Sequence, residues 1–442
     1  MAIFSFIQRY LAKLKRDDFA RNVLVMFTGT ALGQFCSVLL SPLLTRIYSP
    51  EMFGVLGVFT AVVGILSTVA TLRYEMALPL VRTQTDAANL LAVCIAALVI
   101  TVTTAAAVVG GISIAGAAAS VFGVVAPYRW FMPLGLLCIG AYNVLLYYAT
   151  RQHDFRVIAR TKLYQGGVGP VSQIVLGLMG AGIGGLVTGS ILGQSAGIGY
   201  MTSRLLVAPR ALAGASMAGM GAIAKRFRHF FLVSSWAGII EEAGNGYLLL
   251  MVMPVLYSST AVGFIFLTDR IIGRPLLLIS TSILQVYVGD VSRSIATDPG
   301  AVRRRFLQMA GQQFVIVAGW LLLVNVVAPY VIPLVFGEAW AGTVPYLRVL
   351  SIAYLPRMVL HAITHTLQVL EKQMLSALWE AGRLIALIGA FFISYRLGFD
   401  ALHALLAYSI VQAAAHLLLF ILMYKSIQSL QKVSPDEEIA EI

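Results

Sequence analysis

Residues Leu90–Val109 read LLAVCIAALVITVTTAAAVV and contain no charged side chain. A helix needs about 20 apolar residues to cross a bilayer, and this run has that length. Its apolar residues are continuous, whereas the strands of a transmembrane barrel alternate apolar and polar residues. The stretch therefore predicts a membrane-spanning α-helix.

The composition extends this interpretation from one helix to the whole protein. Of its 442 residues, 59% are hydrophobic and only 11% are charged, against about 25% charged in an ordinary soluble domain. The mean hydropathy is +0.87. Too few polar residues remain to cover a soluble globule, which argues against a cytosolic enzyme, a nucleic-acid-binding protein or a secreted domain. Disorder is disfavoured because it requires low hydrophobicity.

Apolar runs of this kind recur along the chain. A span with a short loop takes roughly 35 residues, so we predict an all-α polytopic membrane protein with about 12 transmembrane helices in two six-helix bundles. The expected spans are 22–44, 52–72, 87–109, 128–150, 163–180, 184–206, 230–253, 261–288, 307–328, 344–370, 374–395 and 399–424. The expected domains are an amphipathic surface helix over 1–21, a first bundle over 22–206, a cytoplasmic linker over 207–229, a second bundle over 230–424 and a cytoplasmic tail over 425–442.

The distribution of positive charge predicts the orientation of these helices. With both termini inside, 23 of the 31 Lys and Arg residues lie in inner segments and only 4 lie in outer segments. Such an excess follows the positive-inside rule. The same rule accounts for the formal net charge of +12, so we expect no nucleic-acid partner.

A short motif occurs once in each half of the chain. Tyr48-Ser49 is followed by Gly54, and Tyr257-Ser258 is followed at the same spacing by Gly263. An even number of spans per half gives both halves the same topology, so we expect parallel repeats related by an axis along the membrane normal. In such folds the substrate site lies between the halves.

Ionisable side chains at membrane depth are costly and usually face a cavity or one another. Most of those in this chain fall in the second bundle. They are Glu241, Glu242, Asp269, Arg270, Arg274, Arg357, His361, His365, Glu380, Arg383 and His416. Regular helical spacing places Arg270 and Arg274 on one face. It also aligns Arg357, His361 and His365 in a stripe.

These residues allow two interpretations. In the first, they line a hydrated, net-cationic cavity where arginine forks bind pyrophosphate and a carboxylate or histidine carries a proton. In the second, they form structural ion pairs, such as Asp269 with Arg270, that only hold helices together. We favour the structural interpretation for the pair of Glu380 with Arg383 and for His416.

No motif in the sequence indicates an enzyme. GxSxG, HExxH and GxxxxGK[ST] are all absent, and each of them marks a well-defined chemistry. Cys36, Cys94 and Cys138 lie in apolar runs with no CxxC or metal-ligand spacing. We therefore predict no enzymatic activity, no catalytic residue, no metal site and no cofactor.

Four stretches carry a family resemblance. They are SPLLTRIYSPEMFG at Ser41–Gly54, TLRYEMALP at Thr71–Pro79, DRIIGRP at Asp269–Pro275 and FGEAW at Phe336–Trp340. Together they resemble the Wzx-type polysaccharide flippases, which are the O-antigen and exopolysaccharide translocases of the MOP superfamily. That superfamily also contains the MATE drug exporters and the lipid II flippase.

The resemblance implies a MATE-like fold that works by alternating access in the cytoplasmic (inner) membrane of a bacterium. The implied cargo is an undecaprenyl-pyrophosphate-linked oligosaccharide, moved from the inner to the outer leaflet for surface polysaccharide synthesis. The implied partners are this lipid-linked sugar, the lipid bilayer, and the polymerase and other polysaccharide-assembly proteins.

The resemblance and the buried charges together give the candidate site residues. Expected to bind the pyrophosphate or sugar are Arg46, Arg73, Arg270, Arg274 and Arg357. Expected to couple protons or gate the cycle are Glu75, Glu241, Glu242, Asp269, His361 and His365. Because Arg46 and Arg73 lie at opposite ends of the first two spans, both cannot contact one bound headgroup.

Two other functions stay open at this stage. A cation-coupled multidrug exporter of the same fold would need buried carboxylates facing an organic cation, for which Glu241 and Glu242 are the candidates. A membrane-embedded sugar polymerase or ligase would need a large outer loop with reactive groups, and the expected outer loops are short.

Overall fold

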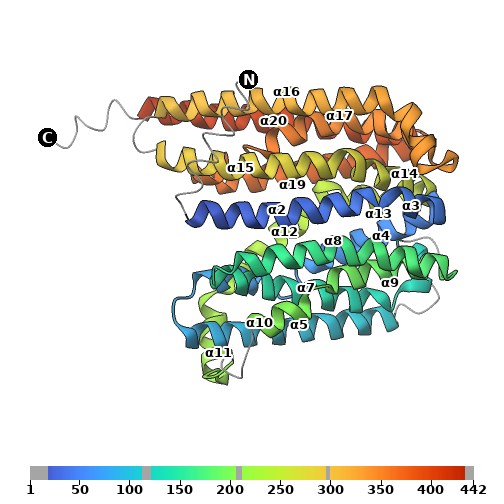
Figure 1. Ribbon diagram of the computed structural model, residues 1–442. Coiled ribbons are helices and arrows are strands. Elements are labelled where there is room, and N and C mark those ends of the chain that lie inside the picture. Colours follow the sequence, from blue (N-terminus) through green and yellow to red (C-terminus); the bar gives the residue numbers. More distant parts are fainter. Residues whose placement is uncertain (1–17, 112–120, 206–211, 295–298, 434–442) are drawn as a thin grey trace. The chain divides into compact units, whose positions relative to one another are not determined.

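The computed structural model describes residues 18–111, 121–205, 212–294 and 299–433. Within these ranges every regular element is helical and no strand occurs, which confirms the predicted all-α class. Figure 1 follows the chain from blue at α2 to red at α20. Most of the expected surface helix over 1–21 lies outside the described residues, and so does the tail beyond residue 433.

The described chain divides into two compact units. The first comprises the residues up to Tyr48 together with Phe59–Ile239. The second comprises Ser49–Val58 together with the residues from Ile240 onward. Helix α4 (Pro50–Ser67) therefore belongs to the second unit in its first half and to the first unit in its second half.

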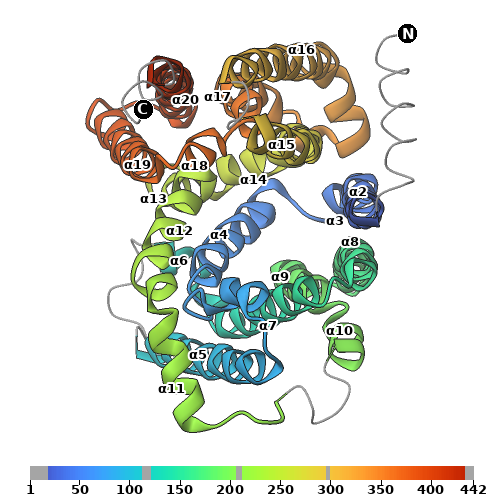
Figure 2. The same ribbon diagram turned by 90° about the vertical axis from the view of Figure 1, so that its left-hand side faces the viewer.

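In the first unit, α2 packs along α8 and α8 packs along α9 (Figure 2). The elements of this unit besides α4 are α2 (Asp18–Leu39), α3 (Ser41–Ile47), η1 (Tyr74–Leu80), α5 (Gln84–Gly111), α6 (Val121–Val125), η3 (Ala126–Tyr128), α7 (Phe131–Arg151), α8 (Phe155–Leu178), α9 (Gly182–Ser195), α10 (Ile198–Leu205), α11 (Met217–Arg226) and η5 (Phe230–Ser234). Helix α12 (Ser235–Glu242) continues from it into the second unit.

In the second unit, α17 packs along α20, and α16 and α19 pack beside them. Its remaining elements are η6 (Ala243–Tyr247), α13 (Leu248–Leu256), α14 (Ser259–Thr268), η7 (Asp269–Gly273), α15 (Arg274–Ser294), α16 (Pro299–Val331), η8 (Ile332–Phe336), η9 (Glu338–Trp340), α17 (Thr343–His361), α18 (Thr366–Val369), α19 (Gln373–Arg396) and α20 (Ala401–Val433).

Eight helical stretches among the described residues are long and apolar enough to cross a membrane. They are Thr28–Ile47, Pro50–Ser67, Gln84–Gly111, Phe131–Arg151, Phe230–Leu256, Gly300–Phe336, Gln373–Arg396 and Ala401–Ser429. The third contains the run from which the sequence analysis began. Helices that are shorter or less apolar occupy the other expected spans, namely α8, α9 with α10, α14 with α15, and α17. The protein is a multi-pass membrane protein, while the total of twelve crossings and the orientation stay predictions.

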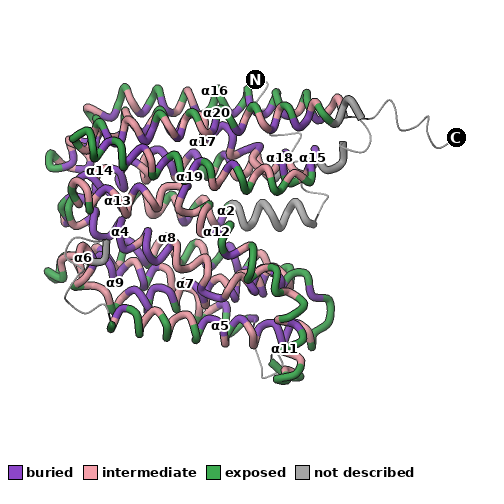
Figure 3. The backbone as a smooth tube through the Cα atoms, turned by 180° about the vertical axis from the view of Figure 1, so that it is seen from behind, coloured by how far each residue is buried: buried purple, intermediate pink, exposed green. Residues whose placement is uncertain are grey.

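The outward faces of the long helices are apolar, as a lipid environment requires. Along α16, Leu322, Leu323, Val326 and Tyr330 are all exposed. Figure 3 shows the same pattern along the helix, with exposed positions recurring between buried ones. In water such a surface would aggregate, whereas in lipid it needs no cover.

Three expected boundaries move in the structure. Helix α8 begins at Phe155 rather than near 163, because the Asp154 side chain caps it by accepting a hydrogen bond from the backbone N–H of Val157 at 3.2 Å. The expected linker over 207–229 contains α11, whose Ile223 is buried in the first unit. The expected tail over 425–442 begins as the last turns of α20.

The motif repeated in the two halves starts two helices in the same way. The Ser49 hydroxyl accepts the backbone N–H of Met52 at 3.3 Å where α4 begins. The Ser258 hydroxyl accepts the backbone N–H of Ala261 at 3.1 Å where α14 begins. Each cap satisfies a donor that the first helical turn leaves free.

The glycines of the two motifs bring these helices into close contact. A Cβ atom at Gly54 would overlap the carbonyl oxygen of Ser259, and a Cβ atom at Gly263 would overlap the carbonyl oxygen of Pro50. The contact is reciprocal, since the two glycines and their two partners are each 209 residues apart. Only glycine permits the backbones to approach this closely, as at other tight crossings in membranes.

We predict that Gly54→Ala and Gly263→Ala each destabilise the purified protein by about 1–3 kcal/mol, because an added methyl group must push one backbone away from the other. Thermal unfolding in detergent measures this effect. Gly319→Ala is the matched control, since a Cβ atom there meets open space in the middle of α16. The double variant should lose less than the sum of the single losses, because both substitutions open the same contact. Wild-type stability in both single variants would contradict the prediction.

Candidate functional site

The first group of predicted site residues lies where α14 meets α15, at an irregular turn of the helix. Between the two helices, η7 is a π-helical turn, and the backbone N–H of Arg274 bonds to the carbonyl oxygen of Asp269, five residues back. Residues five apart therefore share a face here. The carboxylate of Asp269 accordingly pairs with the Nε atom of Arg274 at 3.6 Å.

This turn corrects two expectations. The ionic partner of Asp269 is Arg274 and not Arg270. Arg270 and Arg274 also have different surroundings, although a regular helix would place them on one face. The extra residue in the π turn shifts the helical phase, which regular spacing cannot anticipate.

A tyrosine from α17 completes the surroundings of Asp269. The hydroxyl of Tyr354 donates a 2.7 Å hydrogen bond to Asp269 Oδ1. Gly273 makes room for this bond, because a Cβ atom there would overlap the same carboxylate oxygen. The side chains of Asp269 and Arg274 are 44% and 37% exposed within the described chain, so the pair is open on one side.

Arg270 is held on aromatic faces. Its guanidinium carbon lies 5.5 Å from the centre of the Phe53 ring and 5.4 Å from that of Phe266. Phe53 in turn meets Trp340 edge-to-face at 5.1 Å. Three of the four stretches that carry the family resemblance thus converge on one cluster through Phe53, Arg270 and Trp340. A cation on an aromatic face is stabilised while it keeps its full charge.

Arg357 has a similar environment on α17. Its guanidinium carbon lies 5.7 Å from the centre of the Tyr354 ring, which also carries the hydroxyl bound to Asp269. Among the described residues, no acidic side chain comes within ion-pair distance of Arg357.

The prediction that Arg357, His361 and His365 lie along one helical face is wrong for His365. Helix α17 ends at His361, and His365 lies after a turn, where α18 begins. The Nε2 atom of His361 and the Nδ1 atom of His365 are buried without a hydrogen-bond partner in the described part of the chain.

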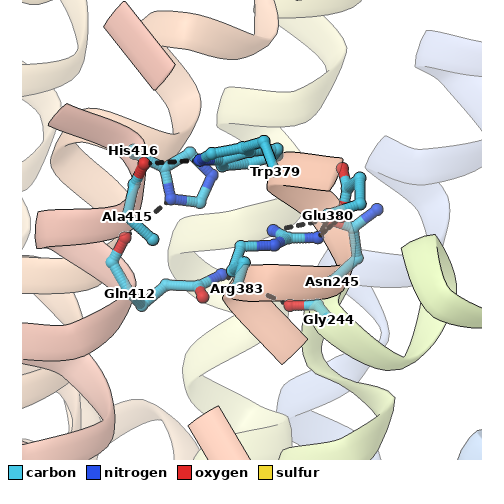
Figure 4. A network of polar contacts seen from close by, with 8 residues as sticks. All are labelled: Gly244, Asn245, Trp379, Glu380, Arg383, Gln412, Ala415 and His416. Carbon is cyan, nitrogen blue, oxygen red and sulfur yellow. Dashed lines mark hydrogen bonds and ion pairs between the residues drawn. The ribbon is translucent and has the colours of Figure 1, made fainter. Parts of the chain in front are cut away.

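Among the arginines whose side chains the structure describes in this unit, Arg383 on α19 is the most deeply buried, with its side chain 1% exposed. It pairs with Glu380, as the sequence predicts, and stacks on Trp379 with its guanidinium carbon 4.8 Å from the ring centre. Its Nη1 and Nη2 atoms each donate to Asn245 Oδ1 at 3.3 Å (Figure 4). Arg383 therefore ties α19 to the π-helical turn η6.

The same network joins α20, as Figure 4 shows. Gln412 Nε2 donates to the carbonyl oxygen of Gly244 at 3.3 Å, and Trp379 Nε1 donates to that of Ala415 at 2.7 Å. His416 Nδ1 donates to the carbonyl oxygen of Gln412 at 2.7 Å, which fixes its tautomer. These bonds hold three elements around a broken helix, in agreement with the structural interpretation of Glu380, Arg383 and His416.

The two remaining acids among the predicted site residues of the second unit lie at the end of α12. Glu241 is exposed and Glu242 is half-buried. The turn η6 follows them directly, and its Gly246 has a φ of 128°, a conformation that glycine adopts without strain. The helix therefore changes direction immediately after the acid pair.

The other predicted residues belong to the first unit. Arg46 is exposed in the last turn of α3. Glu75 is buried in η1, while Arg73 precedes that element with a left-handed φ of 63°. The structure thus gathers Asp269, Arg270, Arg274 and Arg357 in one unit and places Arg46, Arg73 and Glu75 in the other.

Sequence reasoning missed the aromatic partners of the arginines. Tyr354 precedes Arg357 by three residues and Phe266 precedes Arg270 by four. Both spacings put the ring and the cation on one helical face, so a search for such pairs would have found them. Phe53 and Trp340 carry no local signal, because they meet Arg270 through the tertiary fold.

Comparison with known proteins identifies the family. A family model described as "Polysaccharide biosynthesis protein" matches residues 43–345. No curated protein matches the sequence.

Solved structures match over almost the whole chain. A structure of the lipid II flippase MurJ in an inward closed conformation has a TM-score of 0.65 at 11% identity, covering 92% of this chain and 89% of its own. An outward-facing multidrug resistance MATE family transporter of the MOP superfamily has a TM-score of 0.59 at 16% identity, covering 95% and 98%. A MOP superfamily transporter from Pyrococcus furiosus has a TM-score of 0.58 at 14% identity, also covering 95% and 98%.

At these identities the structural likeness establishes the fold, and the match of the family model over more than half of the chain establishes the family. The chain belongs to the polysaccharide biosynthesis protein family and has the fold shared by MATE transporters and MurJ.

Proposed function

We propose that the protein is a flippase that moves an undecaprenyl-pyrophosphate-linked oligosaccharide from the inner to the outer leaflet of a bacterial cytoplasmic membrane. The product would serve surface polysaccharide synthesis, such as that of O-antigen or exopolysaccharide. Membership of the polysaccharide biosynthesis family and the fold shared with MurJ, whose structure is titled a lipid II flippase, support the proposal.

The observation that carries the proposal is the way in which the second unit holds Arg357. This arginine lies against Tyr354 and has no acidic side chain within ion-pair distance among the described residues. Arg270 likewise lies on two aromatic rings. The face of the Tyr354 ring stabilises the Arg357 cation without occupying its guanidinium N–H donors. Those donors suit a pyrophosphate, which accepts two parallel hydrogen bonds per arginine.

The acids of the second unit favour an anionic cargo over a cationic drug. Asp269 is already paired with Arg274, and Glu380 with Arg383. A drug exporter would need carboxylates that face an organic cation. Glu241, exposed at the end of α12, and the half-buried Glu242 beside it are the candidates for that role. The exporter is therefore the second candidate function.

In the proposed mechanism, Arg270 and Arg357 bind the pyrophosphate while the lipid tail stays in the bilayer. The sugars cross with the headgroup, and relative movement of the two units exposes it to one side of the membrane and then to the other. The energy of binding then comes mainly from charge-assisted hydrogen bonds, which are common to every sugar sequence on the same carrier.

We predict that Arg270→Ala and Arg357→Ala each weaken binding of undecaprenyl pyrophosphate to the purified protein by roughly ten- to a hundredfold, since a hydrogen bond to a charged group contributes about 1.5–3 kcal/mol. Arg357→Lys should recover only part of the loss, because an ammonium group lacks the planar fork. Binding is measured against undecaprenol, which has the same tail and no charge.

Arg348→Ala is the matched control for this measurement. Arg348 lies on the same helix as Arg357 but is exposed, so its removal should leave binding unchanged. Equal binding of the charged and uncharged lipids, or wild-type affinity in both arginine variants, would rule out the proposed pyrophosphate site.

We also predict that deletion of the gene causes lipid-linked sugar to accumulate on the cytoplasmic side of the membrane and abolishes the surface polysaccharide. Leaflet-resolved measurement of undecaprenyl-pyrophosphate-linked sugar in the host tests this. Arg270→Ala should reproduce the defect with normal amounts of protein in the membrane. Intact polysaccharide combined with new sensitivity to cationic drugs would favour the exporter instead.

A further inference from the structure

The segment between α4 and α5 is buried although it lies outside the candidate membrane spans. The spans on either side end at Ser67 and begin at Gln84. Between them, η1 packs against α5 and α7, and its Ala77 and Leu78 are fully buried in the core of the first unit. This segment contains Glu75, which the sequence places among the residues expected to couple protons or gate the cycle.

Glu75 is a buried acid whose hydrogen-bond partners, the Thr71 side chain and its own backbone, are neutral. It is 4% exposed, and its carboxylate accepts a hydrogen bond from the hydroxyl of Thr71, which is itself buried. Within the described ranges, no Lys, Arg or His side chain comes within ion-pair distance of this carboxylate. A buried carboxylate in this situation lacks the compensation that its charge requires.

Arg73 is close in sequence, but its guanidinium group points elsewhere. Its Nη1 atom contacts the sulfur of Met76 at 3.4 Å. Its Nη2 atom fills the space beside Gly238 of α12, where a Cβ atom would overlap it. Its Nε atom is buried without a hydrogen-bond partner among the described residues. The nearest cation to Glu75 is thus held away from it against another helix.

The backbone that holds Arg73 in this position is strained. Leu72 and Arg73 both have left-handed conformations, with φ of 53° and 63°. Residues with a side chain rarely adopt this region, and two in succession are held there only by the surrounding packing. The strain can be released if the turn moves, and such a movement would carry the guanidinium group away from Gly238.

The other titratable groups around Glu75 supply no positive charge. They are Tyr147 on α7, Cys94 on α5 and Tyr74 in η1 itself. Burial raises the pKa of Glu75 above its ordinary value, against the opposing effects of the Thr71 hydrogen bond and the charge of Arg73. None of these three groups therefore requires Glu75 to be ionised.

We propose that Glu75 is a proton-binding site that carries a proton in the conformation described here. Release of the proton to water leaves a carboxylate, and the still-protonated Arg73 then moves from Gly238 to pair with it. The site thus links one proton to one rearrangement of α12 against η1. Its use to drive export rests on the flippase function proposed above, whereas proton binding itself does not.

Infrared spectroscopy of the purified full-length protein at neutral pH tests the site directly. The carbonyl stretch of a protonated carboxyl group should be lost in Glu75→Gln, which keeps the shape and cannot carry the proton. Glu51→Gln is the matched control, since Glu51 is an exposed acid at the start of α4, and it should leave the band intact. A band that is unchanged in Glu75→Gln overturns the proposal. No substrate is needed, so this result is independent of the flippase function.

Gly238→Ala tests the link to Arg73 without changing either charged residue. The added methyl group must displace the guanidinium group, so the variant should lose the protonated-carboxyl band at neutral pH as its Arg73 pairs with Glu75. Gly221→Ala on α11 meets open space and should retain the band. Retention of the band in Gly238→Ala would overturn the proposed exchange of Arg73 between its two partners.

Stability against pH gives a second measurement. Because the pKa of Glu75 is raised in the folded protein, its stabilising neutral form is present at low pH and is lost as pH rises through that raised value. Glu75→Gln cannot ionise, so its melting temperature should increasingly exceed that of the wild type as pH rises. A difference in melting temperature that stays constant with pH would overturn the assignment.

Surface polysaccharide in cells then separates the proton site from its use. If Glu75→Gln lacks the infrared band and also loses polysaccharide, the proton drives export. If the band is lost while polysaccharide stays normal, the coupling to export is overturned, and the proton site stands. If deletion of the whole gene leaves polysaccharide intact, the proposed flippase function fails by itself.

Discussion

The bilayer satisfies no backbone hydrogen bond, and this constraint governs the rest of the structure. Every N–H and C=O group at membrane depth needs a partner within the chain, so the fold is built from helices. Breaks in these helices are tolerated only where side chains replace the lost bonds. At η6 the carbonyl oxygen of Gly244 accepts a hydrogen bond from Gln412, and Asn245 accepts two from Arg383. The buried charges are therefore concentrated where the backbone is irregular.

The two units handle buried charge in different ways. In the second unit, Arg270, Arg357 and Arg383 lie on aromatic faces. The aromatic rings stabilise these cations, so keeping them charged at membrane depth costs less free energy. Arg383 also pairs with Glu380, and Arg274 pairs with Asp269. In the first unit, Glu75 has a hydroxyl as its partner. Burial there disfavours the charged carboxylate, so the neutral acid has the lower free energy. Permanent charge suits a permanently anionic ligand, whereas a group that can lose its charge suits a proton.

The sequence predicts what depends on composition and charge, and it fails where helical phase or tertiary contact decides. Apolar runs predicted the helices, and buried charges predicted the Glu380–Arg383 pair. The π turn at Asp269–Gly273 and the end of α17 at His361 broke the regular spacing on which two other expectations depended. No local pattern marks either feature. The contact of Phe53 with Arg270 joins residues far apart in the chain, so a single sequence cannot reveal it.

The repeated motif shows how one backbone pattern came to carry different chemistry in the two halves. Serine caps and reciprocal glycines make the first turns of α4 and α14 equivalent at a constant separation of 209 residues. At that separation, Thr60 and Ala61 correspond to Asp269 and Arg270. The helix continues unbroken through Thr60 and Ala61, whereas the π turn begins at Asp269. An inserted residue rephases the helix, so α15 can present Arg274 to Asp269. The difference in charge between the two halves and the difference in their backbones thus both follow from this π turn.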